Sequence, residues 1–305
     1  MDYITLHTRP ELRTPTLIAA FEGWNDAAYA ATTAAHVLCQ RWRARAFADI
    51  EPEEFYAFTE TRPRVRPAGR TQRRIEWPAN TFFYTQVPEH PRDYVVLIGI
   101  EPQLRWKAFG GTIIGMCREL HISTMVTLGA LLDSVPHTHL PRISGSSNDP
   151  AWLDQLRQFG LDGSRYQGPT GIVGVLSVLA GEHGLRTASL WGHVPHYLQG
   201  MRNPRVALAL LQRLSRVLDV PLDLRELEHV ARQFDSQVAE AVAQNPEAAE
   251  YVHRLEAGLA AGGTAGAAAD EGPEGELPSG EALVQDLEEF LRRRHRPGGG
   301  RSADG

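Results

Sequence analysis

Acidic and imidazole side chains follow the apolar runs of this 305-residue chain, where they could bind or activate a small polar ligand. The apolar runs are Thr16–Phe21, Tyr94–Ile100, Ile122–Leu132 and Thr187–Val194. Carboxylates and histidines are the groups that proteins most often use to move protons at a reacting centre. The candidate residues at or beyond the ends of these runs are Glu22, Trp24, Asn25, Asp26, Glu101, Arg105, Asp133, His137, His193 and His196.

The elements that must position these residues alternate in type. Short apolar runs bounded by polar residues predict strands that are buried on both faces. Between and beside them, the spacing of apolar residues predicts helices over Ala27–Arg41, Arg105–His121, Pro150–Phe159 and Ile172–Ala180. This alternation predicts a mostly parallel sheet with helices on both faces, whose strand carboxyl ends form the usual ligand-binding edge. We therefore expect the candidate residues to meet at one rim of the sheet.

The remaining segments complete a three-layer α/β fold. A further strand is predicted over Ala44–Ile50. The β-rich segments Arg73–Trp77 and Thr81–Val87 flank a Pro-Ala-Asn turn, which predicts an inserted hairpin and makes the sheet mixed. Amphipathic patterns predict C-terminal helices over Pro204–Leu218, Leu222–Gln244 and Pro246–Leu255.

Several candidates also have a purely structural interpretation. Asn25 and Asp26 could simply cap the helix that follows them. Glu101 and Arg105 could pair in the first turn of their helix. Large aromatic side chains dominate protein cores, which favours packing roles for three tryptophans: Trp24, Trp106 and Trp191.

The histidines raise the question of a metal. His137 and His139 form an HxH pair, His193 and His196 form an HxxH pair, and Asp133 is nearby in the sequence. Zinc accepts such ligands. Both pairs follow strands, in loops whose geometry the sequence leaves open, so we expect no bound metal.

A glycine-containing turn, Gly168-Pro169-Thr170-Gly171, opens the helix that begins at Ile172. The free N–H groups at a helix start can bind an anion, which makes this turn a candidate anion site. The turn lacks both glycine-rich nucleotide-binding patterns, and glycine more often permits a tight turn. No nucleophile elbow or zinc-protease signature occurs in the chain.

Arginines are concentrated after the predicted strand Ala44–Ile50 and at the start of the β-rich segment Arg73–Trp77: Arg62, Arg64, Arg66, Arg70, Arg73 and Arg74. In an extended chain the alternating arginines of this stretch would share one face. Such a face usually protects an exposed edge strand from aggregation. The alternative is a docking surface for an acidic partner.

Composition narrows the classes of function. The net charge of −6 argues against nucleic acid as a partner, because that partner must be neutralised by basic groups. Cys39 and Cys117 are expected to be buried, reduced thiols of a cytoplasmic protein. The first thirteen residues are polar and show no signal peptide, and we expect no membrane span.

Residues 1–257 are expected to form one α/β domain. Residues 258–280 are rich in Ala, Gly, Glu and Pro, which predicts a disordered linker. Residues 281–295 then form a tethered amphipathic helix, which is expected to bind a partner protein or to pack on its own domain. Its apolar face carries Leu283, Leu287 and Phe290.

Five sequence segments together resemble the bacterial branch of the proteasome assembly chaperone 2 family. They are Phe21-Glu22-Gly23-Trp24-Asn25-Asp26, Gly99-Ile100-Glu101-Pro102, the region Leu128–Thr138, Gly168-Pro169-Thr170-Gly171 and Trp191–Tyr197. The resemblance covers about residues 3–255 and implies an α/β fold similar to nucleoside phosphorylases, self-association into a homo-oligomer, and proteasome subunits as partners. It transfers no catalytic residue. The chain lacks the C-terminal hydrophobic–tyrosine–any tail with which relatives dock.

We therefore expect a non-catalytic assembly or interaction protein that uses no cofactor and binds a protein partner. The alternative is an enzyme or binding protein for a small molecule, such as a nucleoside or a phosphate-type ligand. That alternative depends on the predicted rim of the sheet, where the candidate side chains must share a pocket.

Overall fold

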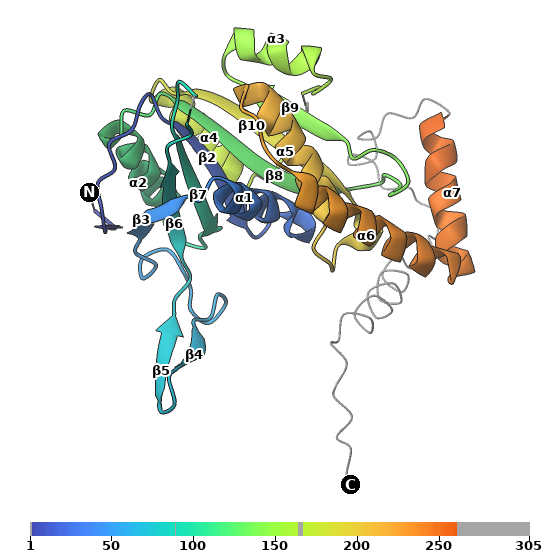
Figure 1. Ribbon diagram of the computed structural model, residues 1–305, viewed down its shortest axis with the longest axis horizontal. Coiled ribbons are helices and arrows are strands. Elements are labelled where there is room, and N and C mark those ends of the chain that lie inside the picture. Colours follow the sequence, from blue (N-terminus) through green and yellow to red (C-terminus); the bar gives the residue numbers. More distant parts are fainter. Residues whose placement is uncertain (1, 89, 164–166, 261–305) are drawn as a thin grey trace.

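The computed structural model describes residues 2–88, 90–163 and 167–260 (Figure 1). The strands are β1 (Ile4–Leu6), β2 (Thr16–Glu22), β3 (Arg45–Ile50), β4 (Arg64–Ala68), β5 (Gln72–Glu76), β6 (Asn80–Thr85), β7 (Tyr94–Ile100), β8 (Thr124–Asp133), β9 (Ile143–Ser147) and β10 (Arg186–Pro195). The α-helices are α1 (Ala30–Arg41), α2 (Trp106–Glu119), α3 (Pro150–Gln158), α4 (Ile172–Glu182), α5 (Pro204–Leu218), α6 (Arg225–Ala243) and α7 (Pro246–Ala260). Short 3₁₀ turns lie at Ala27–Tyr29 and His196–Leu198.

Eight strands form one mixed sheet in the order β1-β3-β6-β7-β2-β8-β10-β9. The four central strands, from β7 to β10, pair in parallel. The pairings at both edges are antiparallel. The expectation of a mostly parallel sheet was therefore wrong. Antiparallel strands need no crossover helix between them, so β1, β3, β6 and β9 could be added at the edges without further βαβ units.

Helices cover both faces of this sheet. Side chains of β2 alternate between two cores, with Ile18 and Ala20 on one side and Leu17 and Phe21 on the other. Helices α1 and α5 complete the first core, and α2 and α4 complete the second. The burial predicted for this strand on both faces is confirmed, because only its last residue, Glu22, is exposed.

The inserted hairpin differs from the prediction. Strand β5 pairs with β4, as a separate two-stranded ribbon, and β6 joins the main sheet between β3 and β7. Gly69, with a φ of 86°, lies in the turn between β4 and β5. A left-handed residue suits such a tight turn, and glycine adopts it without a steric cost. The Pro-Ala-Asn segment therefore links two sheets.

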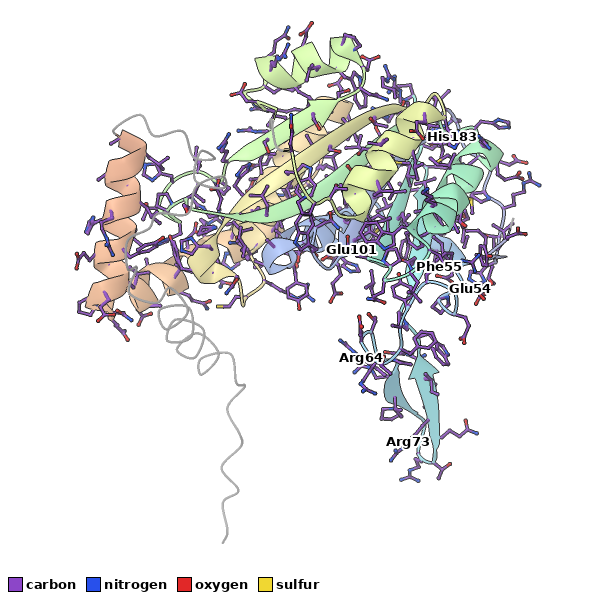
Figure 2. All side chains as sticks on the ribbon, turned by 180° about the vertical axis from the view of Figure 1, so that it is seen from behind. Glu54, Phe55, Arg64, Arg73, Glu101 and His183 are labelled. Carbon is purple, nitrogen blue, oxygen red and sulfur yellow. The ribbon has the colours of Figure 1, made fainter. Side chains whose placement is uncertain are left out.

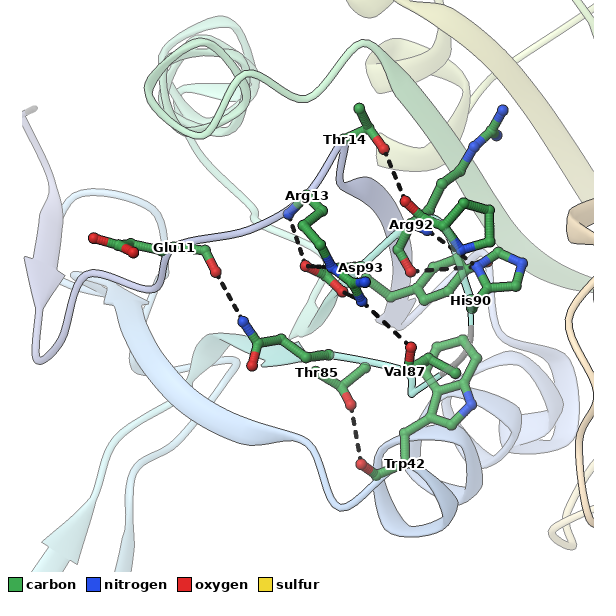
Figure 3. A network of polar contacts seen from close by, with 12 residues as sticks. Glu11, Arg13, Thr14, Trp42, Thr85, Val87, His90, Arg92 and Asp93 are labelled. Carbon is green, nitrogen blue, oxygen red and sulfur yellow. Dashed lines mark hydrogen bonds and ion pairs between the residues drawn. The ribbon is translucent and has the colours of Figure 1, made fainter.

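The buried carboxylate of Asp93 fastens the amino ends of the central strands (Figure 3). The candidate residues lie at or beyond the carboxyl ends of these strands. Asp93 accepts hydrogen bonds from the Arg13 backbone N–H and from Arg13 Nη2, both at 2.7 Å. The Asp93 side chain is fully buried. The Thr16 N–H also donates to the Asp93 carbonyl oxygen at 3.0 Å, so β2 and β7 begin in a fixed register.

Close packing between β8 and β10 gives the first testable prediction. A Cβ atom added to Gly129 would lie 2.7 Å from the ring of Trp191 on the neighbouring strand. Gly129→Ala is therefore expected to lower the free energy of unfolding by about 1–2 kcal/mol, as overpacking does in other cores. Urea denaturation measures the effect. The control is Gly111→Ala in α2, where the added atom meets open space and should be neutral or stabilising.

The C-terminal helices form a smaller core. Tyr197 and Leu198 pack against α6 and α7 through Phe234, Val238 and Val252. The predicted helices of this region are confirmed, and α7 continues to Ala260, beyond the predicted start of the linker. The rest of that linker and the predicted helix at 281–295 lie outside the described residues.

Two further expectations concern thiols and membranes. Cys117 is a buried free thiol, whereas Cys39 is free but only partly buried, which corrects the expectation for that residue. Among the described ranges, none of the helices combines the length and the apolar character that crossing a bilayer requires.

Candidate functional site

Glu101, just beyond the end of β7, is the centre of a first polar group at the carboxyl edge of the sheet. Its Oε1 accepts hydrogen bonds from Asn25 Nδ2 at 2.6 Å and from the Ile172 N–H at 2.8 Å. Its Oε2 accepts a hydrogen bond from the Trp24 N–H at 3.2 Å. Figure 2 shows Glu101 close to the amino end of α4, where partial positive charge favours a carboxylate. Glu101 therefore ties together the ends of β2, β7 and α4.

The turn before α4 is shaped by its contact with Asn25. Asn25 is fully buried, and a Cβ atom on Gly171 would lie 2.2 Å from Asn25 Oδ1. Glycine is therefore required there for close approach. The Ile172 N–H, which an external anion would use, already donates to Glu101. The anion site predicted at this turn gains no support from these contacts and stays a prediction. The exposed residues of the turn include Gly168 and Thr170.

Asp26 caps α1 with its carboxylate. Its Oδ1 accepts hydrogen bonds from the N–H groups of Ala31 at 2.7 Å and Thr32 at 3.2 Å, and the Thr32 hydroxyl donates to Oδ2. The structural interpretation of Asp26 as a helix cap is thereby confirmed. Asn25 does not cap the helix, because its side chain bonds to Glu101 instead.

Burial of Asp26 makes stability depend on pH. Burial raises the pKa of this carboxyl to about 6, although its hydrogen bonds act in the opposite direction. Because an aspartate in an unfolded chain has a pKa of about 3.9, the folded state binds more protons between these two values. The free energy of unfolding should therefore decrease as pH rises through this window.

Asp26→Asn should remove that decrease and raise the free energy of unfolding above pH 7 by about 1–2 kcal/mol, since no buried charge remains. Urea denaturation between pH 4 and pH 8 measures both effects. Asp149→Asn is the matched control, because Asp149 caps α3 through the Trp152 N–H. An unchanged pH profile in Asp26→Asn would show that Asp26 is not the titrating group.

A second polar group joins β8, β9 and β10. His193 Nδ1 lies 2.7 Å from Asp133 Oδ2, and His193 Nε2 lies 2.9 Å from Ser144 Oγ. The side chains of Asp133 and His193 are only 11 % and 8 % exposed, and Ser144 is buried. Burial raises the pKa of the Asp133 carboxyl, but the hydrogen bond and charge of His193 outweigh it, and the net shift is downward.

Two tyrosines extend this second group. The Tyr197 hydroxyl accepts a hydrogen bond from the His137 N–H at 2.7 Å and lies 2.8 Å from His137 Nδ1. His196 Nε2 lies 3.0 Å from the Tyr251 hydroxyl, and its Nδ1 lies 3.3 Å from the Asp133 carbonyl oxygen. Burial, together with the charge of Arg205, lowers the pKa of His137 and so favours its neutral form.

These histidines do not assemble a metal site. Within residues 2–88, 90–163 and 167–260, no group of three or more His, Cys, Asp or Glu side chains is arranged to hold a metal ion. A cavity of about 110 Å³ adjoins the second group and is lined by His137, His139 and His193 among mostly apolar residues. Pockets for drug-sized ligands usually enclose roughly 300–1,000 Å³, so this cavity suits a much smaller molecule.

Two candidate residues contribute little to either group. Arg105 forms an ion pair with Glu54 and donates to the Tyr3 hydroxyl at 2.8 Å, so the predicted pairing with Glu101 is wrong. Glu22 is exposed, and only its backbone carbonyl takes part, by accepting a hydrogen bond from the Glu101 N–H at 2.8 Å.

The tryptophans near the rim differ in role. Trp106 and Trp191 are partly buried and pack against the core on the α2 and α4 side, which confirms their predicted role. Trp24 is 62 % exposed, so its predicted packing role is wrong. Its backbone N–H is held by Glu101, whereas its ring is left on the surface.

The two polar groups occupy neighbouring strands at one edge of the sheet. The Asn25 carbonyl oxygen accepts a hydrogen bond from the Ala130 N–H at 2.8 Å, and Asp26 forms an isolated bridge with Ala130. This contact joins the loop after β2 to β8, which carries Asp133 farther along. Most of the candidate residues therefore lie at this edge of the sheet. They form two separate hydrogen-bonded groups, one around Glu101 and one around the Asp133–His193 pair.

Comparison with known proteins identifies the family of this fold. Residues 20–242 match the model of the PAC2 family. The chain belongs to the PAC2 family. A solved PAC2 family protein from Streptomyces avermitilis is 41 % identical, with a TM-score of 0.72, over 78 % of this chain and 99 % of that one. The resemblance inferred from the sequence is therefore confirmed.

Two further solved structures resemble this chain of the PAC2 family. A proteasome-assembly chaperone homologue from Mycobacterium tuberculosis is 38 % identical, with a TM-score of 0.71, over 78 % of this chain and 99 % of that one. An archaeal proteasome activator from Pyrococcus furiosus is 18 % identical, with a TM-score of 0.63, over 78 % of this chain and 97 % of that one, and shares its fold. No curated protein matches the sequence.

Three residues of this PAC2 chain take part in the second polar group although sequence reasoning missed them: Ser144, Tyr197 and Tyr251. Ser144 lies on β9, whose sequence ISGSS is too short and too rich in serine and glycine to predict a strand. Tyr251 is remote in the sequence and reaches the group only because α7 folds back. The HxxH segment was the available signal for Tyr197, which follows His196 directly.

Proposed function

We propose that the chain is a non-catalytic interaction and assembly protein whose partners are proteasome subunits. The observation that carries this proposal is its 38 % identity to a proteasome-assembly chaperone homologue over nearly all of that protein. The rim supports it as well, because Glu101, Asp26 and Asp133 each bond to other parts of the same chain. Carboxylates used in this way hold the loops of the rim in place.

The proposal includes three finer points. The protein acts in the cytoplasm, where its free thiols stay reduced. It self-associates into a homo-oligomer. The segment 281–295, which carries Leu283, Leu287 and Phe290, adds to partner binding in this proposal.

A direct binding experiment tests the proposal. The full chain is mixed with purified proteasome α and β subunits from the same organism and analysed by size-exclusion chromatography with light scattering. We expect co-elution with at least one type of subunit, and weaker binding by a chain that lacks residues 281–294. Light scattering of the chain alone tests self-association. Separate elution of the chain and both subunits at micromolar concentrations would contradict the proposal.

A second candidate function is favoured by the order Asp133–His193–Ser144. In serine hydrolases a carboxylate orients the histidine, which takes the proton of the serine hydroxyl. A fluorophosphonate probe tests it on the full chain, with Ser144→Ala as the control. A folded chain that gains no label at Ser144 excludes this residue as the nucleophile.

A further inference from the structure

The ribbon formed by β4 and β5 extends away from the layered body of the protein (Figure 1). We name residues 64–76 the arm. The arm belongs to its own two-stranded sheet and shares no strand pairing with the main sheet. Figure 2 shows Arg64 near its base and Arg73 near its tip. We propose that the arm is a docking element that binds an extended, acidic segment of a partner protein with apolar residues between its carboxylates.

The register gives the arm two different faces. Val65 lies opposite Ile75, and Pro67 opposite Arg73, so these side chains share one face. Val65 and Ile75 are 59 % and 54 % exposed. Trp77, two residues beyond Ile75, is 48 % exposed and packs against Phe58 at the base. The arm thus presents an apolar strip on this face.

The other face carries charge. Arg66 lies opposite Arg74, and Arg64 lies opposite Glu76. Arg66 and Arg74 both form ion pairs with Glu76, so one carboxylate serves two guanidinium groups. Within the described residues, Arg64 on this face and Arg73 beside the apolar strip form no ion pair. The arm is therefore locally basic on a chain whose net charge is −6, and it attracts carboxylates.

Two features make the arm unfavourable as a free ribbon, namely its having only two strands and its opposed arginines. An isolated two-stranded hairpin is only marginally stable in water, and like charges placed directly opposite destabilise it further. A partner that covers Val65 and Ile75 offsets the marginal stability of the ribbon. Carboxylates beside Arg64 and Arg73 reduce the net positive charge around the opposed Arg66 and Arg74. The positive charge of the arm therefore favours an acidic segment as its binding partner.

The apolar strip favours a protein over a nucleic acid as the partner of the arm. Phosphates could pair with the arginines, but a phosphate backbone offers nothing to cover Val65 and Ile75. An extended peptide has side chains on alternate sides and can meet both requirements. Strand β5 also has no proline, so its outer edge can accept a peptide as an added strand, whereas β4 contains Pro67.

The experiment uses the full chain and two kinds of binding partner. One is a fluorescent peptide of alternating glutamate and isoleucine, and the other is the purified proteasome subunits. The arm variant is Arg64→Glu with Arg73→Glu. The matched control is Arg45→Glu with Arg232→Glu, two exposed arginines elsewhere that change the net charge equally. Circular dichroism verifies that both variants are folded, and a Val65→Ser/Ile75→Ser variant tests the apolar strip separately.

We expect the arm variant to bind the peptide about tenfold or more weakly than the unmodified chain, as for other arginine-centred contacts, and the control to bind normally. The inference rests on the proposed function only for the identity of the partner. Subunit binding that is unchanged in the arm variant would overturn the inference and leave the proposed function intact. Peptide binding through the arm without subunit binding would support the inference and reject the proposed function.

Three further outcomes oppose the inference. Equal peptide binding by the arm variant and the unmodified chain would show that the arginines do not recognise acidic segments. A 20-base-pair DNA duplex that binds the arm more tightly than the peptide does would make the arm a phosphate-binding element instead. A normal affinity in the Val65→Ser/Ile75→Ser variant would remove the argument for a protein partner.

Discussion

Replacing Glu101 by alanine is expected to lower the free energy of unfolding by about 3 kcal/mol, because three donors lose their acceptor together. Asn25 is fully buried, so its Nδ2 group would have no access to water after the substitution. The Ile172 N–H would lose the carboxylate that complements the amino end of α4, and the Trp24 N–H would lose its contact. The effect should exceed that of an ordinary surface substitution several-fold.

Glu101→Gln separates the charge from the hydrogen bonds. The amide oxygen can still accept from Asn25 and Ile172, but the amide nitrogen would face the Trp24 N–H, so we expect about half of the loss. Urea denaturation measures stability, and hydrogen exchange reports whether residues 23–26 and 171–175 open locally. Equal stability of the alanine variant and the unmodified chain would show that Glu101 does not hold the rim together.

The central part of the fold was predictable from sequence because its strands are buried on both faces. Continuous apolar runs such as Tyr94–Ile100 have few alternatives, and the helices between them have clear periodicity. The edge strands were less predictable. Strand β9 is short and polar, and β1 has only three residues, so neither leaves a hydrophobic pattern of its own. Their pairing depends on the strands beside them.

The arm shows a different limit. Both β5 and β6 were recognised as extended, but a hairpin between them was the wrong pairing. Local composition predicts that a segment is extended, whereas the choice of its neighbour depends on long-range packing. Strand β6 carries Phe82, which is fully buried in the main core, and this burial outweighs pairing with its neighbour in sequence.

The sequence predicted where the candidate residues lie in the fold, but it did not predict which of them contact one another. Topology alone puts Glu101 and His193 at the same edge of the sheet, because both follow or end parallel strands. The division into two groups depends on which side chains approach within hydrogen-bond distance. Glu101 forms hydrogen bonds with Asn25 and with the amino end of α4, and it forms no ion pair with Arg105. Arg105 has a left-handed backbone conformation, and its side chain pairs with Glu54 instead.

Replacing Asp133 by alanine is expected to have the largest effect, about 3–5 kcal/mol, because it breaks a buried pair and leaves His193 without its partner. The downward shift of the Asp133 pKa sets the sign of the pH dependence. A lowered pKa means that the carboxylate stabilises the fold at pH values above that of an unfolded aspartate, about 3.9. This contribution is lost as pH falls through the lower pKa of the folded state.

The difference between Asp133→Ala and the unmodified chain should therefore be constant near neutral pH and shrink below about pH 4. A double-mutant cycle with His193→Ala measures the coupling of the pair, and Ser144→Ala tests whether the hydroxyl adds to it. Asp154→Ala is the matched control, because Asp154 pairs with Arg157 on the surface and should cost less than about 0.5 kcal/mol. A coupling near zero between Asp133 and His193 would mean that each side chain is stabilised independently, and the second polar group would then lose its role in positioning β8 against β10.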